Sequence, residues 1–226
     1  MLDRKTAPTA IGNNFRQIPD RHFRHHNFRH FFKYLFPSFL PEIKLDQSVI
    51  SAIGSRKSII ATIHSKSEYA ILAALERAGL RTAMITASSM NVSKLETYGI
   101  KKPPLGILRT PGAFIEARSA LRDGYTVVCD VDYVLGRRYM NVERYISASL
   151  FDFQRATEAQ MFFAYTRIDE DGQIECIVEQ ARHSSAQPSS LSAAQFIEFI
   201  DKVQGQPSGL KVANWSMHKS QRQRKN

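Results

Sequence analysis

A histidine and a glutamate follow the first strongly apolar segment of the chain at helical spacing. His64 ends the run KSIIATIH, and Glu68 lies four residues later at the start of a helical pattern. At this spacing both side chains lie on one helical face, close enough for the carboxylate to bind an imidazole nitrogen. A histidine held in this way can act as a general base on a hydroxyl. The same pair could instead only cap the helix.

Three further polar residues follow apolar segments. Arg109 comes directly after LGIL, and Asp130 and Asp132 come at the end of the run YTVVC. Reactive groups of open α/β sheets lie beyond the carboxyl ends of the strands, so these are candidate substrate-binding residues. Arg109 could hold an anionic group by paired hydrogen bonds, and the aspartates could hold a polar group. The alternatives are a solvent-facing arginine and aspartates that begin a loop.

Positioning these residues requires strands that end at a common edge, and the chain alternates between strand and helix patterns. The apolar run around residues 58–63 precedes a helical pattern that Gly79 closes, and the apolar run 80–86 follows. This strand, helix and strand unit predicts two parallel strands that are neighbours in the sheet.

A second unit of the same kind predicts a helix over residues 111–124 and a buried strand over 125–134. After a predicted loop at 135–144, the patterns favour these elements: a helix over 147–159, strands over 160–168 and 173–180 joined by the turn DEDG, and a helix over 192–203. We therefore expect an α/β fold whose mostly parallel sheet has an antiparallel margin and carries helices on both faces.

Composition is that of one globular domain, with 226 residues, 43% hydrophobic and 23% charged. Cys129 and Cys176 both lie inside apolar runs, which favours a reducing compartment and excludes a disulfide framework. No apolar stretch approaches the roughly 20 residues of a spanning helix, and no signal-peptide core is evident. The sequence therefore predicts a cytoplasmic protein.

The net charge of +10 is concentrated at the two ends. Residues 1–36 carry seven lysines and arginines against two aspartates, and residues 202–226 carry six against none, so residues 37–201 sum to −1. We therefore predict a basic aromatic lead-in and helix over 1–36, an α/β domain over 37–210 and a basic tail over 211–226.

The aromatic and basic run over residues 20–36 predicts an interfacial helix that brings the domain to an anionic membrane, at its inner face. The same residues could instead pack as a lid over the core. The four histidines of this run have no cysteine or carboxylate among them, so we assign no metal and expect a helix that gains charge on acidification.

The order of these elements resembles the lysophospholipid acyltransferase-like superfamily, and within it the late acyltransferases of lipid A biosynthesis. The resemblance rests on IIATIHSKSEYAILAALERAG, ALRDGYTVVCDVDY, SLFDFQRATEAQMFFAYTRID and ANWSMHKSQ, and covers residues 57–219. In two respects the chain departs from the family: three residues rather than four separate His64 from Glu68, and the aromatic-glycine motif before the later helix is absent.

The resemblance implies transfer of an acyl group from the thioester of acyl carrier protein or CoA to a hydroxyl or amine, on a lipid or glycolipid. His64 would be the base, Glu68 would orient it, and no cofactor would be needed. Two alternatives stay open. One is a non-catalytic lipid- or partner-binding protein on the same scaffold. The other is a nucleic-acid-binding protein that uses its basic ends, although no recognition motif supports a specific nucleic acid.

Overall fold

The computed structural model describes residues 42–65, 69–87, 90, 92–135, 143–168, 173–182 and 188–213. Glu68, the aromatic run 20–36, the turn DEDG and the chain after Ala213 lie outside these residues. All described residues belong to a single compact unit. The predicted boundaries at residues 36 and 210 stay predictions. Among the described helices, none has the length and apolar character needed to cross a bilayer.

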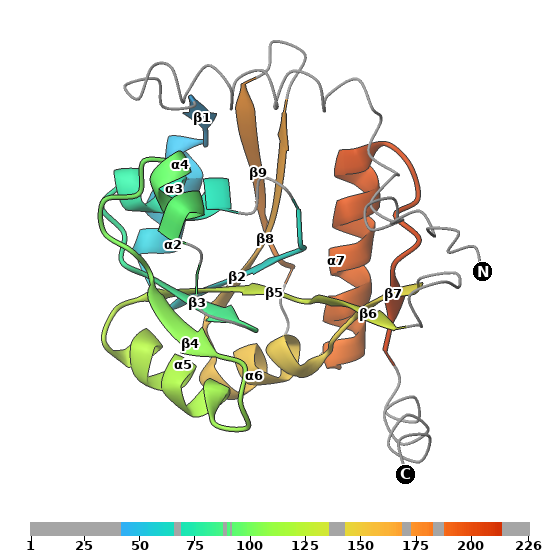
Figure 1. The fold of residues 1–226 in the computed structure, drawn as a ribbon. Coiled ribbons are helices and arrows are strands. Elements are labelled where there is room, and N and C mark those ends of the chain that lie inside the picture. Colours follow the sequence, from blue (N-terminus) through green and yellow to red (C-terminus); the bar gives the residue numbers. More distant parts are fainter. Residues whose placement is uncertain are drawn as a thin grey trace, which may run out of the picture. The chain divides into compact units, whose positions relative to one another are not determined.

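Seven strands form the main sheet in the order β1-β9-β8-β2-β5-β3-β4 (Figure 1). Every neighbouring pair is parallel except β8 and β9. This confirms the predicted α/β fold with a mostly parallel sheet and an antiparallel margin. The strands are β1 (Ile43–Lys44), β2 (Ser58–Thr62), β3 (Thr82–Thr86), β4 (Leu105–Leu108), β5 (Thr126–Asp130), β8 (Gln160–Ile168) and β9 (Ile174–Gln180).

Helices cover both faces of this sheet, as predicted. Alternate residues of a strand point to opposite faces, so Ile59 and Ala61 enter one hydrophobic core and Ile60 enters the other. The first core is shared with α5 (Ala113–Arg122), α6 (Ser149–Thr157) and α7 (Ser189–Gln204). The second is shared with α2 (Gln47–Gly54), α3 (Tyr69–Arg77) and α4 (Val92–Thr97).

Aromatic side chains of β8, α6 and α7 pack together in the first core. The rings of Phe163 and Phe196 meet edge to face with their centroids 5.3 Å apart. Phe151 and Phe199 complete the cluster, and all four side chains are buried. Because such pairs add attraction beyond the burial of apolar area, this cluster fixes α6 and α7 against the sheet.

A second, small sheet stands beside the main one. It contains β6 (Asp132–Leu135), β7 (Glu143–Ile146) and β10 (Lys211–Val212) in the order β10-β7-β6. Only the buried residue Val131 separates β5 from β6, and its N–H donates to the carbonyl of Thr62 while its own carbonyl accepts from the N–H of Ser147. The chain thus passes directly from one sheet to the other.

One predicted neighbour relationship is wrong. The strands of the first predicted unit, β2 and β3, are parallel but not adjacent, because β5 lies between them. Val127 of β5 is paired with Ile59 of β2 and with Ala83 of β3. The crossover rule fixes the direction of two strands in one sheet but leaves room for a later strand between them. The structure also adds β1, α2, α4 and β4, and β7 begins within the predicted loop at 135–144.

Candidate active site

The carboxyl ends of the parallel strands bring most of the predicted site residues to one edge. His64 lies two residues beyond β2, Asp130 is the last residue of β5, and Arg109 directly follows β4. Thr62 of β2 is in register with Asp130 of β5, so the two strands end side by side. The structure therefore gathers residues from three strands, while Glu68 lies outside the described residues.

Asp132 holds the His64 imidazole. The backbone N–H of His64 donates to Oδ1 of Asp132 at 2.7 Å, and the Nδ1 atom of the ring lies 3.0 Å from the same oxygen. An ionised carboxylate can only accept hydrogen bonds, so this contact requires the proton on Nδ1. In that tautomer Nε2 carries the lone pair, and the imidazole side chain is 48% exposed. This is the arrangement that a general base requires.

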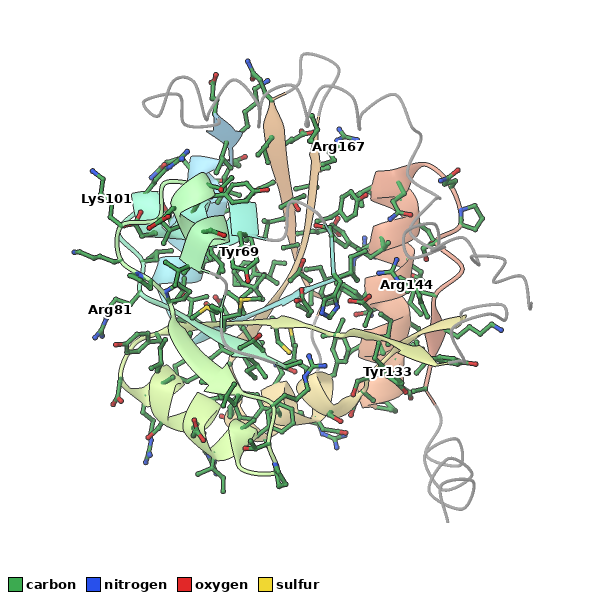
Figure 2. All side chains as sticks on the ribbon, viewed as in Figure 1. Tyr69, Arg81, Lys101, Tyr133, Arg144 and Arg167 are labelled. Atoms are coloured by element: carbon green, nitrogen blue, oxygen red, sulfur yellow. The ribbon has the colours of Figure 1, made fainter. Side chains whose placement is uncertain are left out.

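The electrostatics of Asp132 support the ionised form. Burial by itself raises the pKa of this carboxyl, but hydrogen bonds from His64 and Arg144 outweigh burial and lower the pKa to about 2. Arg144 approaches from β7, and its guanidinium lies 2.5 Å from Oδ2 of Asp132. Arg144, labelled in Figure 2, belongs to β7 and Asp132 belongs to β6, so the small sheet contributes both the carboxylate and its cation.

Asp130 places a second carboxylate near the ring. Its Oδ2 atom lies 3.6 Å from Nε2 of His64, beyond hydrogen-bond reach but within the range of ion pairs. Asp130 and Asp132 are two residues apart in extended chain, and hence point to the same side. Both are at least 95% buried by residue. The imidazole thus lies between two carboxylates, which stabilise its protonated form when it accepts a proton.

Arg109, which directly follows β4, contacts the carboxyl end of β5. Its guanidinium donates to the backbone carbonyl of Asp130 at 2.8 Å and lies 3.9 Å from Sγ of Cys129. Burial raises the pKa of the Cys129 thiol to about 12, against the opposing effect of Arg109. A thiol that stays protonated at neutral pH is a poor nucleophile, so Cys129 contributes packing rather than chemistry.

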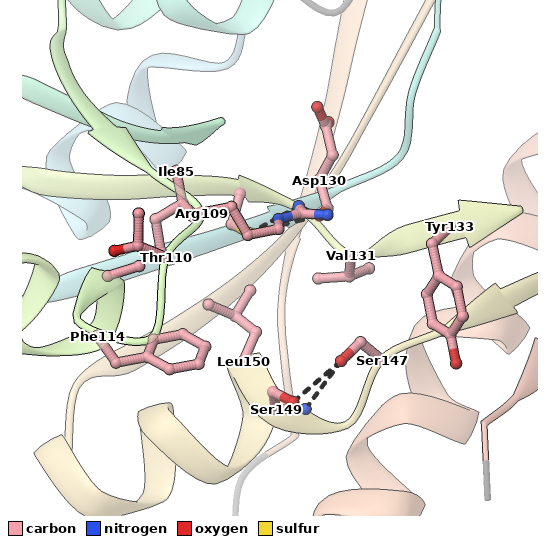
Figure 3. Close-up of a pocket in the computed structure, with 12 residues that line it drawn as sticks. Ile85, Arg109, Thr110, Phe114, Asp130, Val131, Tyr133, Ser147, Ser149 and Leu150 are labelled. Atoms are coloured by element: carbon pink, nitrogen blue, oxygen red, sulfur yellow. Dashed lines mark hydrogen bonds between the residues drawn. The ribbon is translucent and has the colours of Figure 1, made fainter. Parts of the chain in front are cut away.

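A cavity of about 220 Å³ opens where β5 meets the first turns of α5 and α6 (Figure 3). Its wall is mostly apolar, with Ile85, Phe114 and Leu150, and its polar groups include Arg109 and Ser147. His64 does not line this cavity, whereas Asp130 does. In Figure 3 the Asp130 side chain points away from the apolar wall. The cavity and the imidazole therefore lie on different sides of the end of β5. Asp130 borders both of them.

Sequence reasoning located this edge but missed one relationship and one residue. It treated Asp132 as a substrate ligand, whereas the carboxylate at Nδ1 of His64 is that of Asp132. The pattern Asp-Val-Asp after a buried strand could have signalled two carboxylates on one side. Arg144 had no comparable signal, because its position depends on the pairing of β6 with β7.

Within the described part of the chain, no three histidine, cysteine or acidic side chains gather as a metal site would require. No protein-family model matches this sequence, and no curated protein matches it at a significant level.

Proposed function

We propose that this chain is an acyltransferase in which His64 is the general base. It would move an acyl group from the thioester of acyl carrier protein or CoA to a hydroxyl or amine of a lipid or glycolipid. The observation that carries the proposal is the contact between Nδ1 of His64 and the buried Asp132 carboxylate at 3.0 Å. The resemblance of residues 57–219 to the lysophospholipid acyltransferase-like superfamily supplies the reaction class.

In the proposed reaction Nε2 of His64 accepts the proton of the acceptor hydroxyl as its oxygen attacks the thioester carbonyl carbon. The carbon–sulfur bond then breaks, and the imidazolium returns the proton to the departing thiolate. Asp132 remains ionised throughout and stabilises the imidazolium, as the carboxylate of a catalytic triad does. A pKa of about 2 is consistent with this role, because the carboxyl holds no proton at neutral pH.

Arg109 is proposed to bind an anionic group of the acceptor or the carrier, and the apolar wall of the cavity to bind a hydrocarbon part. The guanidinium lines the cavity and donates to the backbone carbonyl of Asp130, the residue whose carboxylate lies 3.6 Å from Nε2 of His64. That Glu68 orients His64 stays a prediction. We propose that residues 20–36 bind the inner, cytoplasmic face of an anionic membrane.

A second candidate is a non-catalytic binding protein on the same scaffold. The observation that favours it is the position of His64 between Asp130 and Asp132, because two carboxylates stabilise the imidazolium. An imidazole that is permanently protonated cannot accept a proton from an acceptor. In this case the charged cluster would bind a polar headgroup and no bond would change.

The test measures thiol release from acyl carrier protein and CoA thioesters in the presence of lysophospholipid and glycolipid acceptors. Wild-type protein should turn over, and His64→Ala should lose about 10²–10⁴-fold in kcat. Arg155→Ala, on an exposed ion pair of α6, is the matched control and should keep full turnover. Circular dichroism verifies that each variant is folded.

Equal turnover of His64→Ala and wild type would overturn the assignment of His64. Acceptor binding by wild type without turnover of any thioester would favour the non-catalytic candidate.

A further inference from the structure

Exposed large hydrophobic side chains are concentrated on three consecutive elements, α4, β4 and α5. Among the described residues six such side chains are exposed, and five of them fall within residues 92–122. The most exposed are Ile115 at 77% and Val92 at 65%. The sixth, Leu191, lies on α7. We call residues 92–122 the apolar-basic segment. The five side chains are Val92, Leu105, Leu108, Phe114 and Ile115.

Charge is concentrated on the same segment. Residues 92–122 contain six lysines and arginines and two glutamates, for a net charge of +4. Residues 37–201 as a whole sum to −1, so the remainder of that range carries −5. Within residues 37–201 the positive charge is therefore concentrated on the same stretch of sequence that carries most of the exposed aliphatic side chains. On α5, Ile115 and Arg118 are exposed and three residues apart, which places them on one helical face.

Most of this surface lies at the edge of the sheet that carries His64. Leu108 is the last residue of β4, Phe114 and Ile115 lie in the first turn of α5, and Val92 begins α4. Leu108 is itself the carboxyl end of β4, Phe114 and Ile115 follow β4, Val92 follows β3, and both strands are parallel to β5. Phe114 and Arg109 also line the cavity. The apolar-basic segment thus borders the cavity, and β4 is the outermost strand of the main sheet.

We propose that the apolar-basic segment is a docking surface for an anionic lipid bilayer. Exposed aliphatic side chains with flanking cations supply the two terms that drive interfacial binding, apolar burial and attraction to anionic headgroups. Tryptophan and tyrosine, which with arginine dominate the binding energy of protein interfaces, are absent from the exposed large hydrophobic side chains of this segment, so its apolar part favours lipid over a protein partner. The inference rests on the proposed function, because docking of this segment would bring the cavity to a lipid acceptor.

The experiment is co-sedimentation of the full chain with vesicles of phosphatidylglycerol and phosphatidylethanolamine, compared with vesicles of phosphatidylcholine. The test variant is Leu108→Glu with Ile115→Glu, and neither of these residues lines the cavity. Leu191→Glu on α7, at 45% exposure, is the matched control. The double variant should lose at least about tenfold in partition to anionic vesicles, and the control should match wild type. Residues 20–36 are present in every variant, so the difference reports the apolar-basic segment.

A charge variant separates the attraction to anionic headgroups from the burial of apolar side chains. Arg118→Glu with Arg122→Glu should weaken binding to anionic vesicles at low salt and leave binding to phosphatidylcholine unchanged. Size-exclusion chromatography and acyl carrier protein pull-down accompany each sample. Wild-type partition of the Leu108 and Ile115 double variant would overturn the inference. Unchanged partition with a lost dimer or a lost carrier complex would assign the surface to a protein instead.

Turnover with a short-chain, water-soluble acceptor distinguishes failure of this inference from failure of the proposed function. If turnover depends on His64 while the vesicle variants bind normally, only the docking surface is wrong. If no thioester turns over although the variants lose vesicle binding, the docking surface stands and the proposed reaction is wrong.

Discussion

The Nδ1 atom of His64 lies 3.0 Å from Oδ1 of Asp132, a residue 68 positions later in the chain. The imidazole beyond the end of β2 is thus held by a carboxylate from β6, the strand that follows β5 in the chain. Since Asp132 also accepts the backbone N–H of His64, the carboxylate fixes both the ring and the peptide that carries it.

Asp132→Asn should make the unfolding free energy less dependent on pH. The pKa of Asp132 falls from 3.8 to about 2 on folding, because hydrogen bonds from His64 and Arg144 outweigh the effect of burial. A depressed pKa contributes stability above the unfolded value, about 2 kcal/mol here, which is lost as pH falls toward about 2. Urea unfolding at neutral and acid pH measures the free energy of unfolding. The difference in this free energy between wild type and variant should shrink on acidification. A gap that stays constant would contradict the assignment.

Arg144→Gln should impair turnover by loosening Asp132 rather than by losing substrate contacts. The guanidinium lies 2.5 Å from Oδ2 of Asp132, and its removal leaves a buried carboxylate with fewer donors. Under the proposed function, kcat should fall about tenfold with KM little changed, and Arg144→Lys should restore part of the loss. Arg167→Gln, which removes an exposed ion pair with Glu175, is the control. A change confined to KM would instead indicate that Arg144 binds substrate.

Phe196→Ala should destabilise the fold strongly. Phe196 is fully buried and contacts three aromatic rings between α6, α7 and β8, so its truncation leaves a cavity that rigid neighbours cannot fill. We expect a loss of about 3–5 kcal/mol in the free energy of unfolding. Leu191→Ala on the exposed face of α7 should change it by less than about 0.5 kcal/mol. Chemical denaturation followed by circular dichroism compares the two, and similar midpoints would refute this packing.

Both cysteines should resist thiol reagents in the native protein. Burial raises the pKa of Cys129 and of Cys176 to about 12, so neither is a thiolate at pH 8. Labelling with an aromatic disulfide should therefore be slow in the native protein, even for Cys129, which lines the cavity, and should accelerate in urea. Rapid stoichiometric labelling of either native thiol would show that its pocket is open.

The sequence predicted the layers of the fold well, because apolar runs such as Ile59–Ile63 and helices closed by Gly79 and Gly124 are local signals. Gly79 and Gly124 do adopt positive φ angles, +78° and +79°, after α3 and α5. Strand order was not predictable in the same way. The position of β5 between β2 and β3 depends on contacts between distant segments, and no local pattern encodes it.

Of the five predicted site residues, four lie together in the structure, and Glu68 lies outside the described residues. His64, Arg109, Asp130 and Asp132 do meet at one edge, because parallel strands deliver their carboxyl ends together. Their partners were not predictable, since the helical spacing of His64 and Glu68 says nothing of a carboxylate on another strand. Arg144 enters only through the pairing of β7 with β6.

Only Val131 links β5 to β6, and under the proposed function the small sheet would therefore control the state of His64. Asp132 and Arg144 both belong to the small sheet, whereas His64 follows a strand buried in the middle of the large sheet. A local opening of β6 and β7 would withdraw the carboxylate and its cation from the imidazole while β2 remained folded. The fraction of molecules competent for catalysis would then follow the opening equilibrium of three short strands rather than the global stability of the domain.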